Sequence, residues 1–268
     1  MKILIFGDIV GKIGRRALSA VLPDLRKKHQ PDLVIANGEN LAHGKGITRS
    51  TVDEMFAAGV DILTGGNHTF EGKEGPLLLG DPLYRGRILR PGNYPEGVPG
   101  IGFATKEVGT RRVCVINLQG RVFMKAAVDD PLRAFDRLLA EASALAKPQI
   151  VMVDFHSEAT SEGNAFGWYA DGRATAVWGT HTHVPTADER ILPGGTAFQT
   201  DVGMTGFASG VIGVAKEGPI KTMQTALPVV HELPDEGPAV ANALLVEADP
   251  KTGKATSVER IQRYVEIR

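Results

Sequence analysis

The chain has 268 residues, a formal net charge of −1 and one cysteine, and 43% of its residues are hydrophobic. This composition excludes a disordered chain, which would combine few apolar residues with a high net charge. The near-neutral charge also argues against a surface for long nucleic acid or for a membrane, so neither is expected as a partner. Glycine is in excess, with 32 residues, about 12% against a usual share of about 7%. We expect these glycines where the backbone bends sharply or approaches another group closely.

No apolar stretch is long enough for a signal peptide or a membrane helix. The N-terminal run Met1–Phe6 stops at Gly7 and Asp8, and no 18 consecutive uncharged apolar residues occur elsewhere. The chain is therefore expected to be soluble and cytoplasmic. Cys114 stands in an apolar segment and is expected to be a buried strand residue.

The first 70 residues alternate between apolar strands and helices. Strands are expected at 3–6, 33–36 and 61–63, and helices at 15–29 and 48–58. Pro23 predicts a kink or an early break in the first helix. Nearly continuous apolar strands separated by helices favour right-handed βαβ units in a covered, mostly parallel sheet.

The rest of the chain is less regular. Proline and glycine interrupt residues 75–100, and Asp130-Pro131 is typical of a helix start. Further strands are expected at two places within 101–118 and at 150–155, 190–192, 197–198, 221–227, 244–247 and 257–267. Without an internal repeat or a clear boundary, residues 1–268 are expected to form one α/β domain of two packed sheets flanked by helices.

Polar residues of metal-binding type follow five of the apolar strands. In chain order they are Asp8, then Glu39 and Asn40, then Asn67 and His68, then His156, then His181 and His183. The carboxyl ends of strands share one edge of an α/β sheet, where ligands usually bind, so we expect the five segments to converge. Each motif alone is compatible with turn or capping chemistry. Five such coincidences at five strand ends favour a functional site.

The chemistry of these side chains points to transition metals. Carboxylate and amide oxygens combined with imidazoles suit Mn, Fe or Zn better than Ca or Mg. Histidines two residues apart on an extended segment, such as His181 and His183, point to opposite sides and can serve two neighbouring ions. A carboxylate can bridge two ions about 3.5–4 Å apart, and such pairs catalyse phosphoryl hydrolysis by generating hydroxide from water. A histidine that binds no metal could then protonate the leaving alkoxide.

Competing motifs fail on spacing. The segment from Gly7 to Ile13 has three residues between its glycines where a phosphate loop has four, and Ile13 stands where Ser or Thr would hold Mg. The glycines at 7, 11 and 14 also miss the dinucleotide-binding pattern. No G-x-S-x-G elbow is present, and Cys114 has no activating neighbours in the sequence. His29, His43 and His231 are expected to be structural or solvated.

The five strand-end motifs, in their order from Asp8 to His183, resemble those of the calcineurin-like metallophosphoesterases. The motifs of that family are Asp-x-His, Gly-Asp, Gly-Asn-His, a single His and Gly-His-x-His. The chain departs from that pattern in three places, because Val10 replaces a histidine, Glu39 replaces an aspartate, and Thr180 is inserted before His181. These variants are similar to the YmdB-type bacterial subfamily, and the similarity extends over nearly the whole chain. The segments that carry it are Asn37-Gly38-Glu39-Asn40, Thr64-Gly65-Gly66-Asn67-His68, Asp154-Phe155-His156, residues 179–188 and residues 200–206.

This resemblance implies a four-layer α/β/β/α sandwich of two mixed sheets flanked by helices. It implies a phosphodiesterase with two transition-metal ions, iron or manganese with zinc as an alternative, that opens 2′,3′-cyclic nucleotides. In this family pattern Glu39 bridges the two ions and His68 is the proton donor. The other ligands are Asp8, Asn40 and His183 for the first ion, and Asn67, His156 and His181 for the second.

Several alternatives stay open. The second functional hypothesis is a metal-containing regulatory protein that binds nucleotide or RNA with little or no turnover. A metallopeptidase or amidohydrolase is disfavoured, because its His-x-His element normally comes early in the chain. Arg173 and residues 203–206 are candidates for substrate contact, and Trp168-Tyr169 is a core or loop pair or, alternatively, a base-stacking pair. The physiological substrate, the native metal and the formation of a homo-oligomer are left open.

Overall fold

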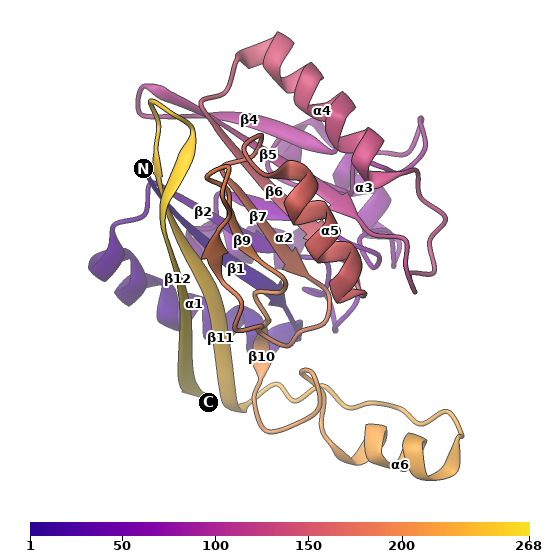
Figure 1. Ribbon diagram of the computed structural model, residues 1–268. Coiled ribbons are helices and arrows are strands. Elements are labelled where there is room, and N and C mark those ends of the chain that lie inside the picture. The colour runs from indigo at the N-terminus through magenta and orange to yellow at the C-terminus, as the bar shows by residue number, and fades with distance from the viewer.

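Two six-stranded sheets packed face to face form the centre of the protein, as the computed structural model of residues 1–268 shows (Figure 1). The first sheet has the order β12-β11-β10-β1-β2-β3 and the second has the order β4-β5-β6-β7-β9-β8. The strands of the first sheet are β1 (Lys2–Ile9), β2 (Leu33–Asn37), β3 (Ile62–Thr64), β10 (Met204–Phe207), β11 (Gly237–Asp249) and β12 (Lys254–Ile267). Those of the second are β4 (Phe103–Val108), β5 (Arg111–Gln119), β6 (Ile150–His156), β7 (Ala176–Thr180), β8 (Arg190–Ile191) and β9 (Ala197–Gln199).

Each sheet is parallel in its middle and antiparallel toward an edge. In the first sheet β1 pairs in parallel with β2 and β10, whereas β11 and β12 are antiparallel. In the second sheet β5, β6, β7 and β9 are parallel, and β4 and β8 add antiparallel edges. The parallel strands of both sheets therefore bring their carboxyl ends together, where the functional residues were expected.

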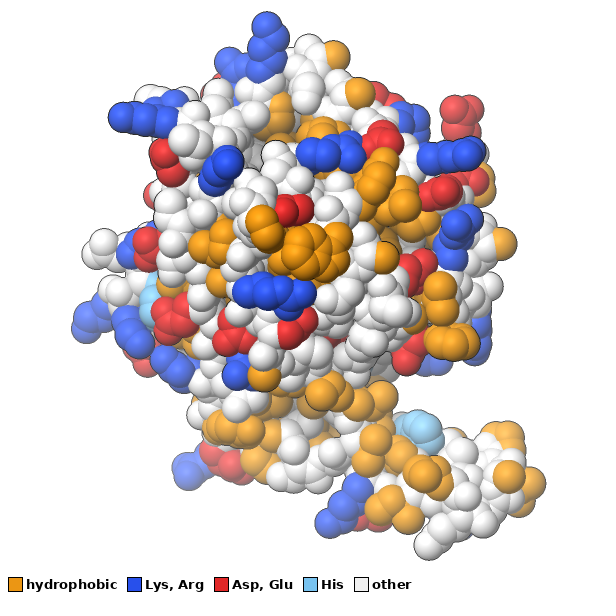
Figure 2. All heavy atoms as spheres, viewed as in Figure 1, with side chains coloured by type: hydrophobic (Ala, Val, Ile, Leu, Met, Phe, Trp, Pro, Cys, Tyr) orange, Lys and Arg blue, Asp and Glu red, His pale blue; other side chains and the backbone are white.

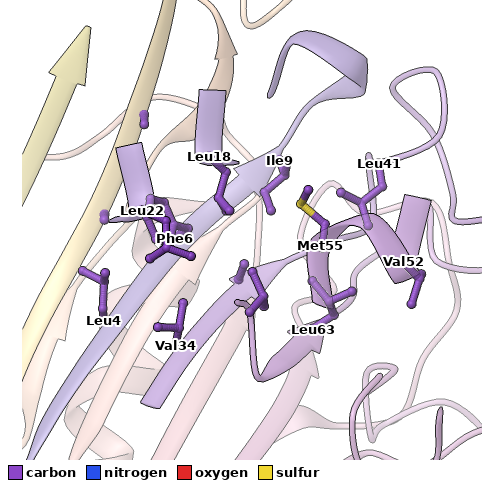
Figure 3. Close-up of a cluster of buried hydrophobic side chains, with 14 of the residues drawn as sticks. Leu4, Phe6, Ile9, Leu18, Leu22, Val34, Leu41, Val52, Met55 and Leu63 are labelled. Carbon is purple, nitrogen blue, oxygen red and sulfur yellow. The ribbon is translucent and has the colours of Figure 1, made fainter. Parts of the chain in front are cut away.

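Side chains on β1 show why four layers form. Ile3 and Ile5 point into the layer between the sheets, where they join a cluster with residues of the second sheet. Leu4 and Phe6 point the other way, against the first helix (Figure 3). This alternation is the period of two that a strand imposes, with both faces buried as in parallel sheets.

Helices cover the outer faces of both sheets. The first sheet is covered by α1 (Gly11–His29), α2 (Arg49–Ala58) and α3 (Glu74–Gly80), which is followed by the short 3₁₀ helix η1 (Pro82–Tyr84). The second is covered by α4 (Pro131–Ala146) and α5 (Thr160–Ala170). The predicted four-layer sandwich of two mixed sheets is thus confirmed. None of the helices combines the length and the apolar character that spanning a membrane requires.

An arm of residues 208–236 projects between β10 and β11 and carries α6 (Glu217–Thr225) (Figure 1). Apolar side chains gather on its surface (Figure 2), and Met223 and Val230 are almost fully exposed. A strand was expected at 221–227, and that prediction is wrong. Because the arm offers no neighbouring strand, the segment satisfies its backbone hydrogen bonds within a helix instead.

Other differences from the sequence-based expectations have local causes. The early break expected at Pro23 does not occur, and α1 continues to His29. Pro23 is exposed, so the carbonyl that it leaves without a helical partner lies on the water-facing side. The helices α3 and α5 were not anticipated.

Cys114 is buried in β5 as expected, and this burial raises the pKa of its thiol to about 12.

Candidate metal centre

The five sequence segments meet at one place, where the two sheets present the carboxyl ends of their parallel strands. Asp8, Glu39, Asn40, Asn67 and His68 come from β1 and from the loops after β2 and β3 of the first sheet. His156, His181 and His183 come from the end of β6 and from the loop after β7 of the second. The sheets are joined there, because the backbone N–H of His181 donates to Asp8 Oδ2 at 3.0 Å.

Four donor atoms surround one point in this cluster. The Nε2 atom of His156 lies 2.9 Å from Asn67 Oδ1, 3.2 Å from His181 Nδ1 and 3.4 Å from Glu39 Oε1. Ligands about 2.1 Å from a tetrahedral ion lie about 3.4 Å from one another. The spacing of these donors therefore fits a single metal ion, and His156 and Glu39 are almost completely buried.

A second group lies beside the first. Asp8 Oδ1 is buried without a hydrogen-bond partner and lies 4.0 Å from His183 Nε2, which is 3.2 Å from the side-chain amide of Asn40. Rotation of that amide by 180° would direct its oxygen toward the same point. Burial raises the pKa of Asp8, although His183 and His156 oppose the rise. An unpartnered carboxylate oxygen in a buried position is costly, and a cation would compensate it.

Glu39 contacts both groups. Its Oε1 accepts from the Asn40 amide at 3.3 Å and lies near His156, while its Oε2 accepts from the backbone N–H of His68 at 2.8 Å. Burial favours the protonated form, but His156 and His68 outweigh it and lower the pKa of Glu39 to about 2. The side chain is therefore an ionised carboxylate in the position that a bridging ligand would occupy.

Each histidine of the cluster is held from its outer side. His181 Nε2 lies 3.0 Å from Glu158, His183 Nδ1 donates to the carbonyl of Ile212 at 2.9 Å, and His156 Nδ1 lies 2.8 Å from the Thr180 hydroxyl. The Thr180 hydroxyl donates to Asp154 and so can accept from His156. These partners fix which nitrogen of each ring faces the cluster, as in known metal sites. Burial lowers the pKa of His156, but Glu39 outweighs it and raises that pKa to about 9, so a metal bound there would displace the proton on the inner nitrogen of His156.

Sequence reasoning missed these outer partners. Asp154 had a detectable signal, since it lies two residues before His156 on the same strand and therefore on the same face. Burial raises the pKa of Asp154 to about 7. Glu158 and Ile212 carried no signal, because loops far apart in the sequence bring them to the histidines.

The backbone around the cluster is tightly constrained. A Cβ at Gly66 would overlap Glu39 Oε2 and His156 Nε2, so only glycine fits there. His181 and His183 have φ values of 109° and 67°. The segment is therefore not extended as expected, and the left-handed conformation is a strain typical of functional sites. The two rings still reach different groups of donors.

His68 lies next to the donor cluster and lines a cavity of about 470 Å³ together with Asn67 and His181. Its Nδ1 is 2.6 Å from Glu71, and its backbone is fixed to Glu39. The ring thus borders the cluster at an open cavity.

Other candidates lie elsewhere. Arg173 precedes β7, at the end away from the histidines, and pairs with Asp136 of α4, so the expectation of substrate contact is wrong. The Tyr169 ring packs against Phe135 of α4, as the structural alternative for that pair expects, whereas the Trp168 side chain is 55% exposed on α5. Residues 203–206 enter β10 beside β1, and the N–H of Met204 donates to the carbonyl of His183.

The fold is that of the metallophosphoesterases, and comparisons with known proteins specify the family. The family model described as YmdB-like protein matches residues 4–261, and the chain belongs to this family. It is 45% identical over 261 residues to the 2′,3′-cyclic-nucleotide 2′-phosphodiesterase of Bacillus subtilis strain 168, covering 97% of this chain and 96% of that one.

Two solved structures are similar over nearly their full length. A hypothetical protein of Thermus thermophilus has a TM-score of 0.90 and 42% identity, covering 98% of this chain and 99% of that chain. A phosphatase of Mycoplasma pneumoniae has a TM-score of 0.91 and 34% identity, covering 100% of this chain and 94% of that chain. The expectations of family, fold and enzymatic nature are therefore confirmed. Membership also implies divalent metal ions, and Glu39, His156 and His181 offer ligand atoms within 4.8 Å of one another.

Proposed function

We propose that this protein is a phosphodiesterase with two metal ions that hydrolyses 2′,3′-cyclic nucleotides. The observation that carries the proposal is the unpartnered, buried Asp8 Oδ1 beside a cage of four donors, which consists of His156 Nε2 and the three atoms around it. Two adjacent groups of donors that share Glu39 suit two ions better than one. The activity named for the Bacillus subtilis relative supports the substrate class.

The donor sets divide between the two groups. Asp8, Asn40 and His183 would hold one ion, Asn67, His156 and His181 would hold the other, and Glu39 would bridge them. Oxygen donors mixed with imidazoles suit iron or manganese, with zinc as the alternative. When bound, two such ions neutralise the phosphate oxygens and acidify an attacking water.

His68 would complete the reaction as the proton donor. The attacking water adds a hydroxyl to phosphorus, one bond between phosphorus and a ribose oxygen breaks, and that oxygen needs a proton as it leaves. Glu71 would accept from Nδ1–H of His68, so the doubly protonated ring would give its Nε2 proton to the leaving oxygen, and the proton released by the attacking water would restore it. Because Glu39 holds the backbone of His68, the ring stays beside the donor cluster.

A product-resolved assay tests the proposal. Protein reconstituted with Mn²⁺ should contain two ions per chain and should convert 2′,3′-cyclic AMP to one ring-opened nucleotide. Absence of ring opening in protein that contains both ions would overturn the proposed substrate class. If bis(4-nitrophenyl) phosphate were also left intact, the result would favour a regulatory protein that binds nucleotide without turnover.

A further inference from the structure

We propose that Phe123 is the surface on which the nucleobase of the substrate stacks. This inference rests on the proposed function and adds to it the residue that would recognise the base. The cavity of about 470 Å³ that contains His68, Asn67 and His181 is also lined by Phe123 and by its neighbours in the loop between β5 and α4. A phosphate at the donor cluster would therefore place the rest of a nucleotide beside this loop.

Phe123 has two properties that do not contribute to the stability of the fold, its exposure and its backbone conformation. Its side chain is 85% exposed, so the ring contributes little to the core. Its φ is 63°, at the third position of a turn that the N–H of Met124 closes on the carbonyl of Arg121. Glycine or asparagine normally occupies such a position, and a bulky residue there is an outlier. A strained and exposed aromatic residue beside a reaction site indicates a binding role.

The base of this loop is held firmly. The backbone N–H groups of Arg121 and Val122 both donate to the carboxylate of Glu162 on α5. At its far end the N–H of Asp129 donates to the carbonyl of Asn93. The ring is thus carried on a loop with fixed ends, which lowers the entropy lost when a ligand binds.

The chemistry of the cavity matches a nucleotide. Aromatic rings bind bases of any sequence through their faces, because every base presents a π-face. Lys45 and Lys125 also line the cavity and supply positive charge for an anion. A second cavity of about 460 Å³ borders His183 and shares Lys45, but the rest of its lining combines aliphatic residues such as Val211 with His43 and His231 and contains no Phe, Tyr or Trp. The loop cavity is therefore the better site for a base.

The first experiment measures binding and needs no turnover. Calorimetry on the Mn²⁺-loaded protein should show that Phe123→Ala weakens the binding of 3′-AMP roughly 5- to 150-fold, the factor that corresponds to one stacking contact. Affinity for inorganic phosphate and the content of two ions should stay unchanged. Phe123→Trp should retain nucleotide binding, whereas Phe123→Leu should lose most of it, because it keeps the apolar volume without the ring.

The second experiment separates this inference from the proposed function. Phe123→Ala should lower kcat/KM for 2′,3′-cyclic AMP by a similar factor. The kcat/KM for methyl riboside 2′,3′-cyclic phosphate, which has no base, should stay unchanged. Val211→Ala is the matched control in the second cavity and should change neither value. Equal losses on both substrates, or a loss with Val211→Ala alone, would overturn the role of Phe123. Failure of the wild-type protein to open either ring would reject the proposed function, and the binding data would still decide whether Phe123 holds a base.

Discussion

The Nε2 atom of His181 lies 3.0 Å from a carboxylate oxygen of Glu158, while the Nδ1 atom of the same ring lies 3.2 Å from His156 Nε2. The carboxylate can only accept a hydrogen bond, so it holds the proton of His181 on the outer nitrogen. The inner nitrogen is then a lone pair directed at the donor cluster. Glu158 therefore decides which nitrogen of His181 is available to a metal.

Loss of Glu158 should weaken metal binding without removing a ligand. Carboxylates that orient a metal-binding histidine typically contribute about 10–100-fold in metal affinity. We expect Glu158→Ala to lower the affinity for Mn²⁺ by a factor in that range, as measured by competition titration with a chelating dye. Glu141→Ala, at an exposed glutamate on α4, should leave the affinity unchanged. An unchanged affinity in Glu158→Ala would show that His181 needs no outer partner.

Replacement of His68 should separate turnover from metal content. Because its ring lies beside the donor cluster and not within it, His68→Ala should keep both ions, measured by elemental analysis. Turnover of 2′,3′-cyclic AMP should fall about 10²–10⁴-fold, the usual effect of losing a general acid. His231→Ala, on the arm, serves as the control. Loss of metal in His68→Ala would contradict the assignment of His68 as proton donor.

Most of the architecture around the cluster was predictable, because burial on both faces imposes nearly continuous apolar strands. This pattern located β1, β2 and β6 and therefore the strand ends that carry Asp8, Glu39 and His156. The convergence of the five segments followed from the topology of parallel strands. The helix expected at 48–58 is α2, which Thr48 caps at its start and the left-handed Gly59 ends, and this capping chemistry depends only on local sequence.

The remaining features depend on contacts that no local pattern encodes. The helix α6 was mistaken for a strand, since an exposed amphipathic segment carries little information about its partners. Glu158 and Phe123 were missed for the same reason, because their roles arise from loops that meet only in the fold. The positive φ of His181 was equally invisible, since only a few per cent of non-glycine residues adopt one and nothing in the local sequence marks which of them do.

Glu39 should be required for both ions, because it contacts both groups of donors and is only 1% exposed. We expect Glu39→Ala to lose both ions on gel filtration in metal-free buffer, whereas the wild-type protein keeps them. Elemental analysis of the eluted protein measures this directly. Retention of a full pair of ions would remove the bridging role, and retention of one would assign Glu39 to a single ion.

Gly66→Ala should damage the donor cluster through shape alone. The added Cβ would overlap Glu39 Oε2 and His156 Nε2, so both side chains would have to move. Overpacking of this kind typically costs about 1–3 kcal/mol, and we expect a lower Tm together with weaker Mn²⁺ binding. Gly80→Ala is the matched control, because the nearest atom to its Cβ would be 4.0 Å away and its backbone needs no positive φ. Calorimetric unfolding and metal titration of the two variants provide the comparison. If Gly66→Ala kept the Tm and the metal affinity of the wild-type protein, the added methyl group would fit beside Glu39 and His156 without disturbing them, and the prediction would be wrong.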